Sequence, residues 1–269
     1  MSFHPFDLAV ALQPQADGSF LGQTSPAYAN MVGPFGGITA AQALNAVLLH
    51  PQRLGDPISL TVNFAAALAD GPFTVTARPA RTNRSTQHWV IEMQQQGEVV
   101  LTGTAFFGLR RDTWGADEHA MPDVPAAVDV ARASGAARVE WFKRYEMRFA
   151  EGAMPAEWDG ADQGLSRTRL WLRDDPPRPL DFASLTALSD VFFPRVWRRR
   201  QVLVPIGTVS MTVYYHADTA LLQRTGSAYL LGQTQAQAFR NGYFDQTAQL
   251  WNEAGELLVT THQVVYYKE

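Results

Sequence analysis

The chain has 269 residues, of which 46% are hydrophobic and 18% are charged, and its formal net charge is −4. This length suits one large domain or two domains of ordinary size, each with a buried core. The 22 basic residues form no long run, which argues against nucleic-acid binding as the main role, because phosphate neutralisation needs a concentrated basic face.

The sequence contains no cysteine, which excludes disulfides, thiolate zinc sites and cysteine nucleophiles. The amino-terminal segment MSFHPFDLAV lacks the basic flank and the apolar stretch of a signal peptide. No run of about 18 apolar residues could span a bilayer. We therefore expect a cytoplasmic protein without a membrane span.

The first predicted element is a helix over residues 36–49, where Ala and Leu are frequent. Gly36 and Gly37 stand at its start, where the missing Cβ lets a ligand or another backbone come close. Strand-like stretches rich in Val, Thr, Phe and Trp follow at residues 58–66, 73–80, 88–94 and 99–107. The Gln96-Gly97-Glu98 break predicts a hairpin turn between the last two strands.

Residues 111–140 mix Pro, Gly, Ala and Asp without a sheet pattern. Such a composition predicts a crossover linker with a short helical turn. We expect it to separate an N-terminal domain, residues 1–110, from a C-terminal domain, residues 141–269.

The C-terminal domain repeats the order of the first. Residues 141–149 and 166–172 are predicted as its first strands, and an apolar helix is predicted over residues 182–193. Four further strands are predicted at residues 207–216, 229–239, 242–251 and 256–267, with a hairpin turn at residues 252–255.

The two halves also align in sequence near their ends. Gly97–Thr102 matches Gly255–Thr260 without gaps, and the same alignment places Asn83 on Asn241. A helix followed by antiparallel strands, present twice, is typical of an α+β fold with each sheet wrapped round a central helix. A doubly wound α/β fold would need helices between successive strands, and they are missing.

Several common catalytic devices are absent from the sequence. It has no G-x-S-x-G elbow of an α/β serine hydrolase, no G-x-G-x-x-G motif and no Walker-type loop. Its six histidines are scattered and show no metal-ligand spacing. We therefore expect neither a metal site nor a cofactor.

Asp190 is a carboxylate in a mostly apolar segment, Leu185–Phe193. Burying a lone carboxylate costs several kcal/mol unless it is hydrogen-bonded. Such a residue often has a raised pKa and works as a base. The structural alternative is a residue at a helix end that faces water or caps the next turn.

Two more polar residues lie in predicted strands. Thr208 opens the strand at residues 207–216, where its β-branching alone would justify its presence. Gln263 alternates with Val264 and Tyr266 and is therefore expected to face inward together with Val265. An inward amide can orient a water molecule or simply satisfy a buried backbone group.

The sequence resembles the acyl-CoA thioesterase II family over residues 33–267. The matching second-half motifs are Leu188-Ser189-Asp190, Ile206-Gly207-Thr208-Val209 leading to Tyr214-Tyr215-His216, and Thr261-His262-Gln263; the first-half motifs are Phe35-Gly36-Gly37 and Gln42-Ala43-Leu44. Members of that family are double hotdog proteins, so the resemblance implies two fused hotdog domains. The loop at residues 195–205 departs from the family pattern by being short.

The resemblance implies hydrolysis of acyl-CoA thioesters. The family's active-site Asp, Thr and Gln are matched by Asp190, Thr208 and Gln263, which would activate a water without a covalent intermediate. Backbone N–H groups at Gly36 and Gly37 would meet the oxyanion charge. Phe192, Phe193 and Trp197 would line an acyl channel or form ordinary core.

The phosphates of CoA require local cations in a chain of net negative charge. The candidates are Arg195, Arg198, Arg199, Arg200 and Arg240, with a solvated loop as the alternative. The family resemblance also suggests a homodimer or a larger assembly.

Two alternative functions remain open. A hotdog enoyl-CoA hydratase uses an Asp with a His five positions later, and no histidine here has an aspartate five positions before it, which disfavours that reading. The other alternative is a non-catalytic module that binds acyl-CoA or lipid. Binding without thiol release would identify it.

Overall fold

The computed structural model describes residues 3–133 and 139–269. In the N-terminal half, helical and extended elements occur in the order α1 (Pro5–Ala9), β1 (Gln13–Pro14), β2 (Phe20–Gln23), η1 (Pro26–Tyr28), α2 (Gly36–Leu48), β3 (Asp56–Phe64), β4 (Pro72–Thr82), β5 (Thr86–Gln95) and β6 (Glu98–Gly108). The helix predicted at residues 36–49 and the four strands after it are all present, with ends shifted by at most two residues.

In the C-terminal half the elements are η2 (Ala127–Asp129), η3 (Glu140–Arg144), β7 (Tyr145–Glu151), β8 (Thr168–Asp174), α3 (Phe182–Leu188), α4 (Arg195–Arg200), β9 (Ile206–Tyr215), α5 (Thr219–Thr225), β10 (Leu230–Gln235), β11 (Phe239–Arg240), β12 (Tyr243–Asn252) and β13 (Leu257–Tyr267). The predicted order of strands, helix and strands is therefore confirmed.

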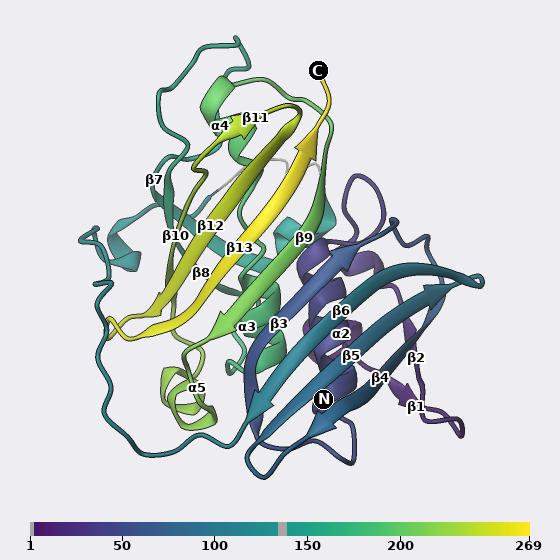
Figure 1. Ribbon diagram of the computed structural model, residues 1–269. Coiled ribbons are helices and arrows are strands. Elements are labelled where there is room, and N and C mark those ends of the chain that lie inside the picture. Colours follow the sequence, from purple (N-terminus) through teal and green to yellow (C-terminus); the bar gives the residue numbers. More distant parts are fainter. Residues whose placement is uncertain (1–2, 134–138) are drawn as a thin grey trace.

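All strands belong to one antiparallel sheet of 13 strands. Its order is β1-β2-β4-β5-β6-β3-β9-β13-β12-β10-β8-β7, with β11 paired to β12 beside this path. The halves join where β3 pairs with β9, for example Val62 with Met211. Thr61 and Thr212 add a hydroxyl–hydroxyl hydrogen bond of 3.0 Å across this junction. The two halves thus share one continuous sheet (Figure 1).

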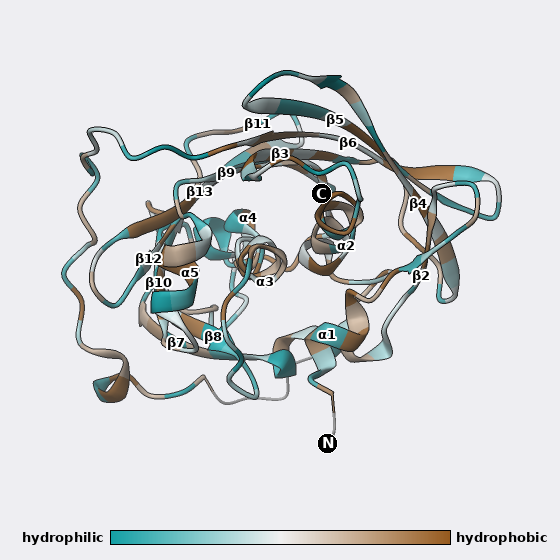
Figure 2. Ribbon diagram, turned by 90° about the horizontal axis from the view of Figure 1, so that it is seen from below, coloured by the Kyte–Doolittle hydropathy of each residue, from teal (hydrophilic) through white to brown (hydrophobic). Residues whose placement is uncertain are grey.

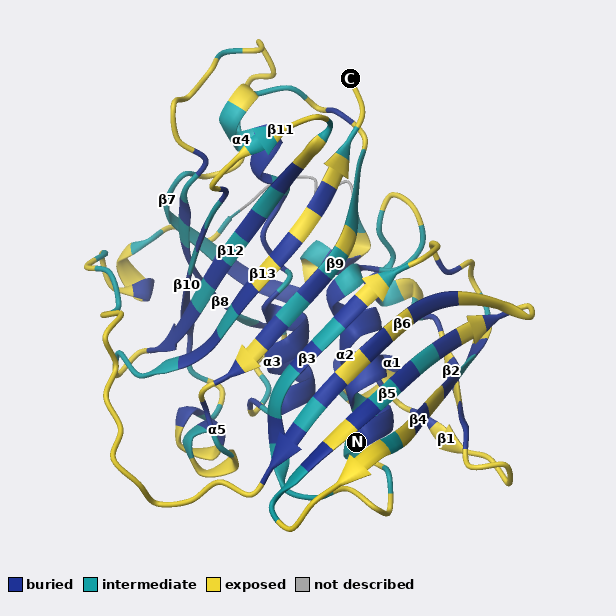
Figure 3. Cartoon of the chain, in the orientation of Figure 1, coloured by how far each residue is buried: buried dark blue, intermediate teal, exposed yellow. Residues whose placement is uncertain are grey.

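The central helices α2 and α3 lie side by side in the concave side of this sheet, as the view from below shows (Figure 2). Their approach is close at Gly37, where an added Cβ would lie 2.6 Å from the carbonyl oxygen of Ala187. The sheet strands alternate between buried and exposed residues (Figure 3). The core fills the space between the helices and the inner sheet face, which confirms the predicted α+β architecture.

Some predicted boundaries are wrong. The helix expected at residues 182–193 ends at Leu188, with Ser189 as its C-cap and a turn at residues 189–190. Residues 195–205, expected as a loop, begin with helix α4. The strand expected from residue 141 starts only at Tyr145, after the 3-10 turn η3. The short elements α1, β1, β2, α5 and β11 carry too few residues for a periodic signal.

The predicted linker, residues 111–140, includes residues 134–138, which lie outside the described residues. Its described part packs on the C-terminal half, where Trp171 Nε1 donates to the carbonyl of Pro125 at 2.8 Å. Trp251 Nε1 donates similarly to the carbonyl of His119 at 3.2 Å. The domain limits 1–110, 111–140 and 141–269 stay a prediction.

No helix in residues 3–133 and 139–269 is long and apolar enough to cross a membrane.

Candidate active site

Asp190 lies in the turn just after α3, and its carboxylate is bonded from the sheet. Gln263 Nε2, from β13, donates to Asp190 Oδ1 at 2.7 Å. Gln263 is 2% exposed, whereas part of Asp190 stays accessible to solvent. The turn at the end of α3 and the inner face of the sheet therefore bring these two predicted site residues together.

The same carboxylate faces the N-terminus of α2, in the other half of the chain. A Cβ added to Gly36 would lie 2.9 Å from Asp190 Oδ2, and the backbone N–H of Gly37 acts to lower the pKa of the carboxylate. The N–H groups of the first helical turn have no intrahelical partner and carry the positive end of the helix dipole. Asp190 is thus placed between both halves, at an end of α2 that favours negative charge.

Burial raises the pKa of Asp190 to about 7, while the hydrogen bonds from Gln263 and Gly37 act in the opposite direction. Desolvation disfavours the charged form of a carboxylate, and donors favour it. The result is a carboxyl group that changes its charge near neutral pH. A pKa close to the working pH is the property that a general base requires.

Thr208 reaches the inner sheet face through a β-bulge. Met211 is paired with Gln263 and Ser210 with Val264, but Thr208, not Val209, is paired with Val265. Met211, Gln263 and Val265 are buried on the inner face. Paired residues in an antiparallel ladder point to the same side, so the bulge at Val209 turns Thr208 inward.

The hydroxyl of Thr208 makes no hydrogen bond to Asp190 or to Gln263 within the part of the chain that the structure describes. Gln263 instead uses its second N–H in a contact of 3.5 Å with Met211 Sδ. Both amide hydrogens of Gln263 therefore point to protein atoms. Its Oε1 has no hydrogen-bond partner among residues 3–133 and 139–269.

The predicted acyl-channel residues lie in the core. Phe192, 6% exposed, belongs to the main hydrophobic cluster, and its ring would meet a Cβ added to Gly232 at 2.8 Å. Phe193 and Trp197 belong to a second cluster beside β12 and β13, in which Phe193 packs edge-on against Phe149. These contacts show that Phe192, Phe193 and Trp197 pack in the core, and their lining of an acyl channel stays a prediction.

The candidate phosphate-binding arginines lie in three different settings. Arg195 is fully buried and bonded to protein atoms, so its guanidinium is out of reach of a phosphate at the surface. Arg199 and Arg200 form ion pairs with Asp162 and Glu269. Arg240 is exposed on β11 and has no ion pair among the described residues. The proposal of Arg195 as a CoA contact is therefore not supported by this geometry.

One inward polar residue was not anticipated from the sequence. Gln246 on β12 is 2% exposed and is paired with Gln263 in the β12–β13 ladder. The signal was present in the alternation of β12, where Phe244 and Ala248 are the neighbouring inward residues. Gln246 is therefore a polar residue at an inward position between apolar ones, the same pattern that marks Gln263.

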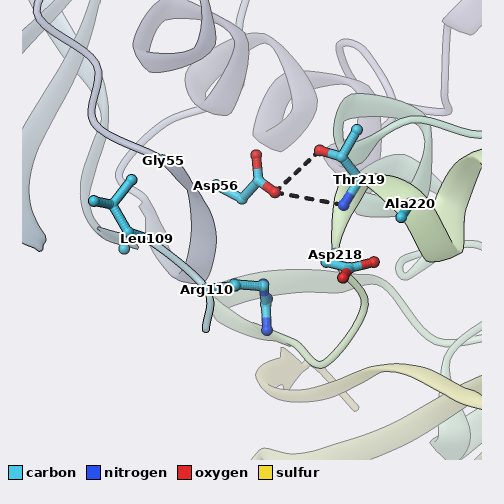
Figure 4. A pocket seen from close by; sticks show the side chains of 8 residues that line it. Gly55, Asp56, Leu109, Arg110, Asp218, Thr219 and Ala220 are labelled. Atoms are coloured by element: carbon cyan, nitrogen blue, oxygen red, sulfur yellow. Dashed lines mark hydrogen bonds between the residues drawn. The ribbon is translucent and has the colours of Figure 1, made fainter. Parts of the chain in front are cut away.

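Residues 3–133 and 139–269 contain no group of three or more His, Cys, Asp or Glu side chains suited to a metal ion. An open pocket of about 250 Å³ lies at the far end of β9 from Thr208 and is shown in Figure 4. Its Arg110 guanidinium donates to the carbonyls of Pro57 and Tyr215, and its Asp56 accepts from Thr219. Both charged groups thus have hydrogen-bond partners within the protein, and no predicted site residue lines this pocket.

Comparison with known proteins identifies the two halves. A family model described as the acyl-CoA thioesterase N-terminal domain matches residues 25–108. A model described as the acyl-CoA thioesterase C-terminal domain matches residues 115–267. No curated protein matches the chain.

Solved structures agree on the fold. A conserved protein of unknown function with a hot dog fold from Alicyclobacillus acidocaldarius is 49% identical, with a TM-score of 0.94 over 100% of this chain and 99% of that one. A candidate thioesterase II from Thermobifida fusca YX is 16% identical, with a TM-score of 0.84 over 100% and 99%. An acyl-CoA thioesterase II from Mycobacterium marinum is 16% identical, with a TM-score of 0.76 over 98% of each chain. The prediction of two fused hotdog domains is thereby confirmed.

Proposed function

Because this chain belongs to the acyl-CoA thioesterase family, we propose that it is an acyl-CoA thioesterase that hydrolyses its substrate to a free fatty acid and CoA. The observation that carries the proposal is the Asp190 carboxylate, held by Gln263 at 2.7 Å in front of the α2 N-terminus. Its pKa of about 7 lets it accept a proton at neutral pH.

In the proposed mechanism, Asp190 accepts a proton from a water molecule held also by Gln263 Oε1 and Thr208 Oγ1. The water oxygen forms a bond to the thioester carbonyl carbon. The C–S bond then breaks, and the proton passes from Asp190 to the departing thiolate of CoA. No covalent enzyme intermediate is needed, which suits a chain without cysteine.

The first turn of α2 supports this chemistry electrostatically. The helix dipole and the N–H groups at Gly36 and Gly37 favour negative charge on the carboxylate and on the oxyanion that develops next to it. The absence of a Cβ at Gly36 leaves room for the Asp190 carboxylate, since a methyl group there would stand 2.9 Å from its oxygen. The missing Cβ at Gly36 thus serves access to the carboxylate.

The test is thiol release from a panel of acyl-CoAs of different chain lengths. We expect turnover by the wild-type protein and a loss of kcat of at least about a hundredfold in Asp190→Asn. Asp174→Asn is the matched control, since Asp174 is also a buried carboxylate with a pKa raised to about 7 and lies on β8, outside the proposed site. Wild-type turnover by Asp190→Asn would exclude its role as base.

Tight binding of acyl-CoA by the wild-type protein without any thiol release would instead identify a non-catalytic binding module.

A cytoplasmic location and a homodimer or larger assembly stay predictions. The side chains of three tyrosines are accessible to a second copy of the chain, since Tyr214, Tyr243 and Tyr266 are 50%, 52% and 37% exposed. Analytical ultracentrifugation of the wild-type protein measures the oligomeric state directly.

A further inference from the structure

Arg195 is a fully buried cation without a carboxylate partner among the described residues. Its Nη1 donates to Ser166 O at 2.9 Å and to Thr168 Oγ1 at 2.7 Å, and its Nε donates to Phe193 O at 2.9 Å. Burial lowers its pKa to about 9. Buried charges are expensive unless they are well bonded, and the hydrogen bonds of Arg195 offset that cost in the absence of a carboxylate.

A further bond of Arg195 leads to the site: its Nε–H is shared between Phe193 O and Gln246. Its Nε lies 3.2 Å from Gln246 Oε1, and Gln246 is the ladder partner of Gln263. Side chains paired in this way have Cβ atoms about 4.5–5.5 Å apart on the same sheet face. The two amides therefore stand side by side on β12 and β13, which are adjacent in Figure 1.

The two amides are held in opposite directions. The NH₂ group of Gln263 donates to Asp190, which leaves its Oε1 free. The Oε1 of Gln246 accepts from the arginine, which leaves its NH₂ group free. Turning the Gln246 amide over would place its N–H donors against the donors of Arg195, so the cation fixes the orientation.

Neither the Gln246 Nε2 atom nor the Gln263 Oε1 atom is fully enclosed by protein. Gln246 Nε2 and Gln263 Oε1 have no hydrogen-bond partner in the described part of the chain, and neither is among its fully enclosed polar atoms without a partner. Both residues are 2% exposed and are paired on the inner face of the sheet, where Gln263 contacts Asp190. The site wall thus presents one acceptor, from Gln263, and one donor, from Gln246.

We propose that Gln246 is a further catalytic residue, whose NH₂ group donates a hydrogen bond to the thioester carbonyl oxygen as it becomes an oxyanion, and that Arg195 is its positioning residue. This inference rests on the proposed thioesterase function. Asp190 and Gln263 Oε1 are acceptors suited to the two hydrogens of the attacking water. The carbonyl oxygen needs donors, and the fixed Gln246 amide is a donor beside them.

The variant Gln246→Glu removes the donor but keeps the shape and gives Arg195 a carboxylate partner, so we expect it to fold. Loss of one oxyanion donor is expected to lower kcat about a hundredfold with a KM change of less than about threefold. Gln249→Glu, three residues along β12 and on the outer face, is the matched control and should retain wild-type kcat. Wild-type kcat in Gln246→Glu would overturn the proposal.

A binding experiment separates this inference from the proposed function. Two unreactive CoA analogues are compared by calorimetry, a ketone that keeps the carbonyl and a thioether that lacks it. We expect the wild-type protein to bind the ketone more tightly and Gln246→Glu to lose that preference. If the wild-type protein shows no turnover but binds the ketone more tightly, and Gln246→Glu loses that preference, the role of Gln246 as a donor is supported and hydrolysis is refuted. If the wild-type protein binds both analogues equally, the role of Gln246 as a donor is refuted.

Discussion

Thr208 is paired with Val265 across the β9–β13 ladder, although the register of the following residues would place Val209 there. The bulge at Val209 reverses the alternation of β9 and turns Thr208 to the inner face, where Gln263 lies two residues from Val265. A residue that the register alone would direct to the outer face is thereby available to the proposed site.

We expect Thr208→Val to lower kcat about tenfold, the equivalent of one hydrogen bond of about 1.4 kcal/mol. Thr208→Ser keeps the hydroxyl and should stay within about threefold of the wild-type rate. Thr212→Val is the control in the same kinetic assay, since Thr212 lies on the outer face of the same strand and its hydroxyl bonds to that of Thr61. A wild-type rate in Thr208→Val would show that the hydroxyl is dispensable.

The rate should depend on the charge of Asp190. Because its pKa is raised to about 7 and the ionised form is the base, kcat/KM should fall about tenfold for each pH unit below 7 and level off above it. Gln263→Leu removes a donor that favours the ionised form, so the midpoint should move to higher pH. A profile that is flat between pH 5 and 8 would contradict this assignment.

The two glycines at the start of α2 should respond differently to alanine. In Gly36→Ala the new methyl would meet Asp190 Oδ2 at 2.9 Å, so kcat should fall while helix propensity compensates stability by up to about 1 kcal/mol. In Gly37→Ala the methyl would meet the Ala187 carbonyl and the Phe35 ring, both at 2.6 Å, so the melting temperature should fall. Kinetics and thermal unfolding of both variants check the contrast; equal effects on both properties would refute it.

Asp174 should make stability depend on pH. It is 2% exposed, and burial raises its pKa to about 7. The side chain titrates at about pH 4 in the unfolded state, so between about pH 4 and pH 7 the folded state binds one additional proton. The free energy of unfolding therefore falls as pH rises through this range, and the loss is complete above pH 7. Asp174→Asn should therefore be more stable by roughly 1–3 kcal/mol at pH 8, with no gain at pH 4. Urea unfolding at both values measures this, and an equal gain at both would contradict the linkage.

Arg240 is the exposed candidate for the CoA phosphates. Arg240→Ala should raise KM for an acyl-CoA about threefold to tenfold, the range of one exposed ionic contact, and leave KM for the matching acyl-pantetheine unchanged. Arg224→Ala is the control, since Arg224 is also exposed but pairs with Glu256 in the region of α5. An equal rise in KM for both substrates would place the contact elsewhere.

The sequence by itself determined the order of elements, because helix composition and strand alternation are local properties. The helix at Gly36–Leu48 and the strands up to Gly108 were predicted within two residues. Gln263 was expected to face inward from period two alone, and it does, since the bulge beside it adds its extra residue to β9 and leaves the alternation of β13 unbroken. The resemblance to thioesterases depended on the same local motifs.

Only the tertiary structure decided how the site is assembled. Asp190, Gln263 and the α2 N-terminus lie far apart in the sequence, and the β3–β9 junction of the two halves brings them together. The burial of Arg195 and the inward turn of Thr208 depend on packing and on a bulge, which no pattern of residue types specifies. The raised pKa of Asp190 has the same origin, because desolvation is a property of the assembled protein and not of the chain.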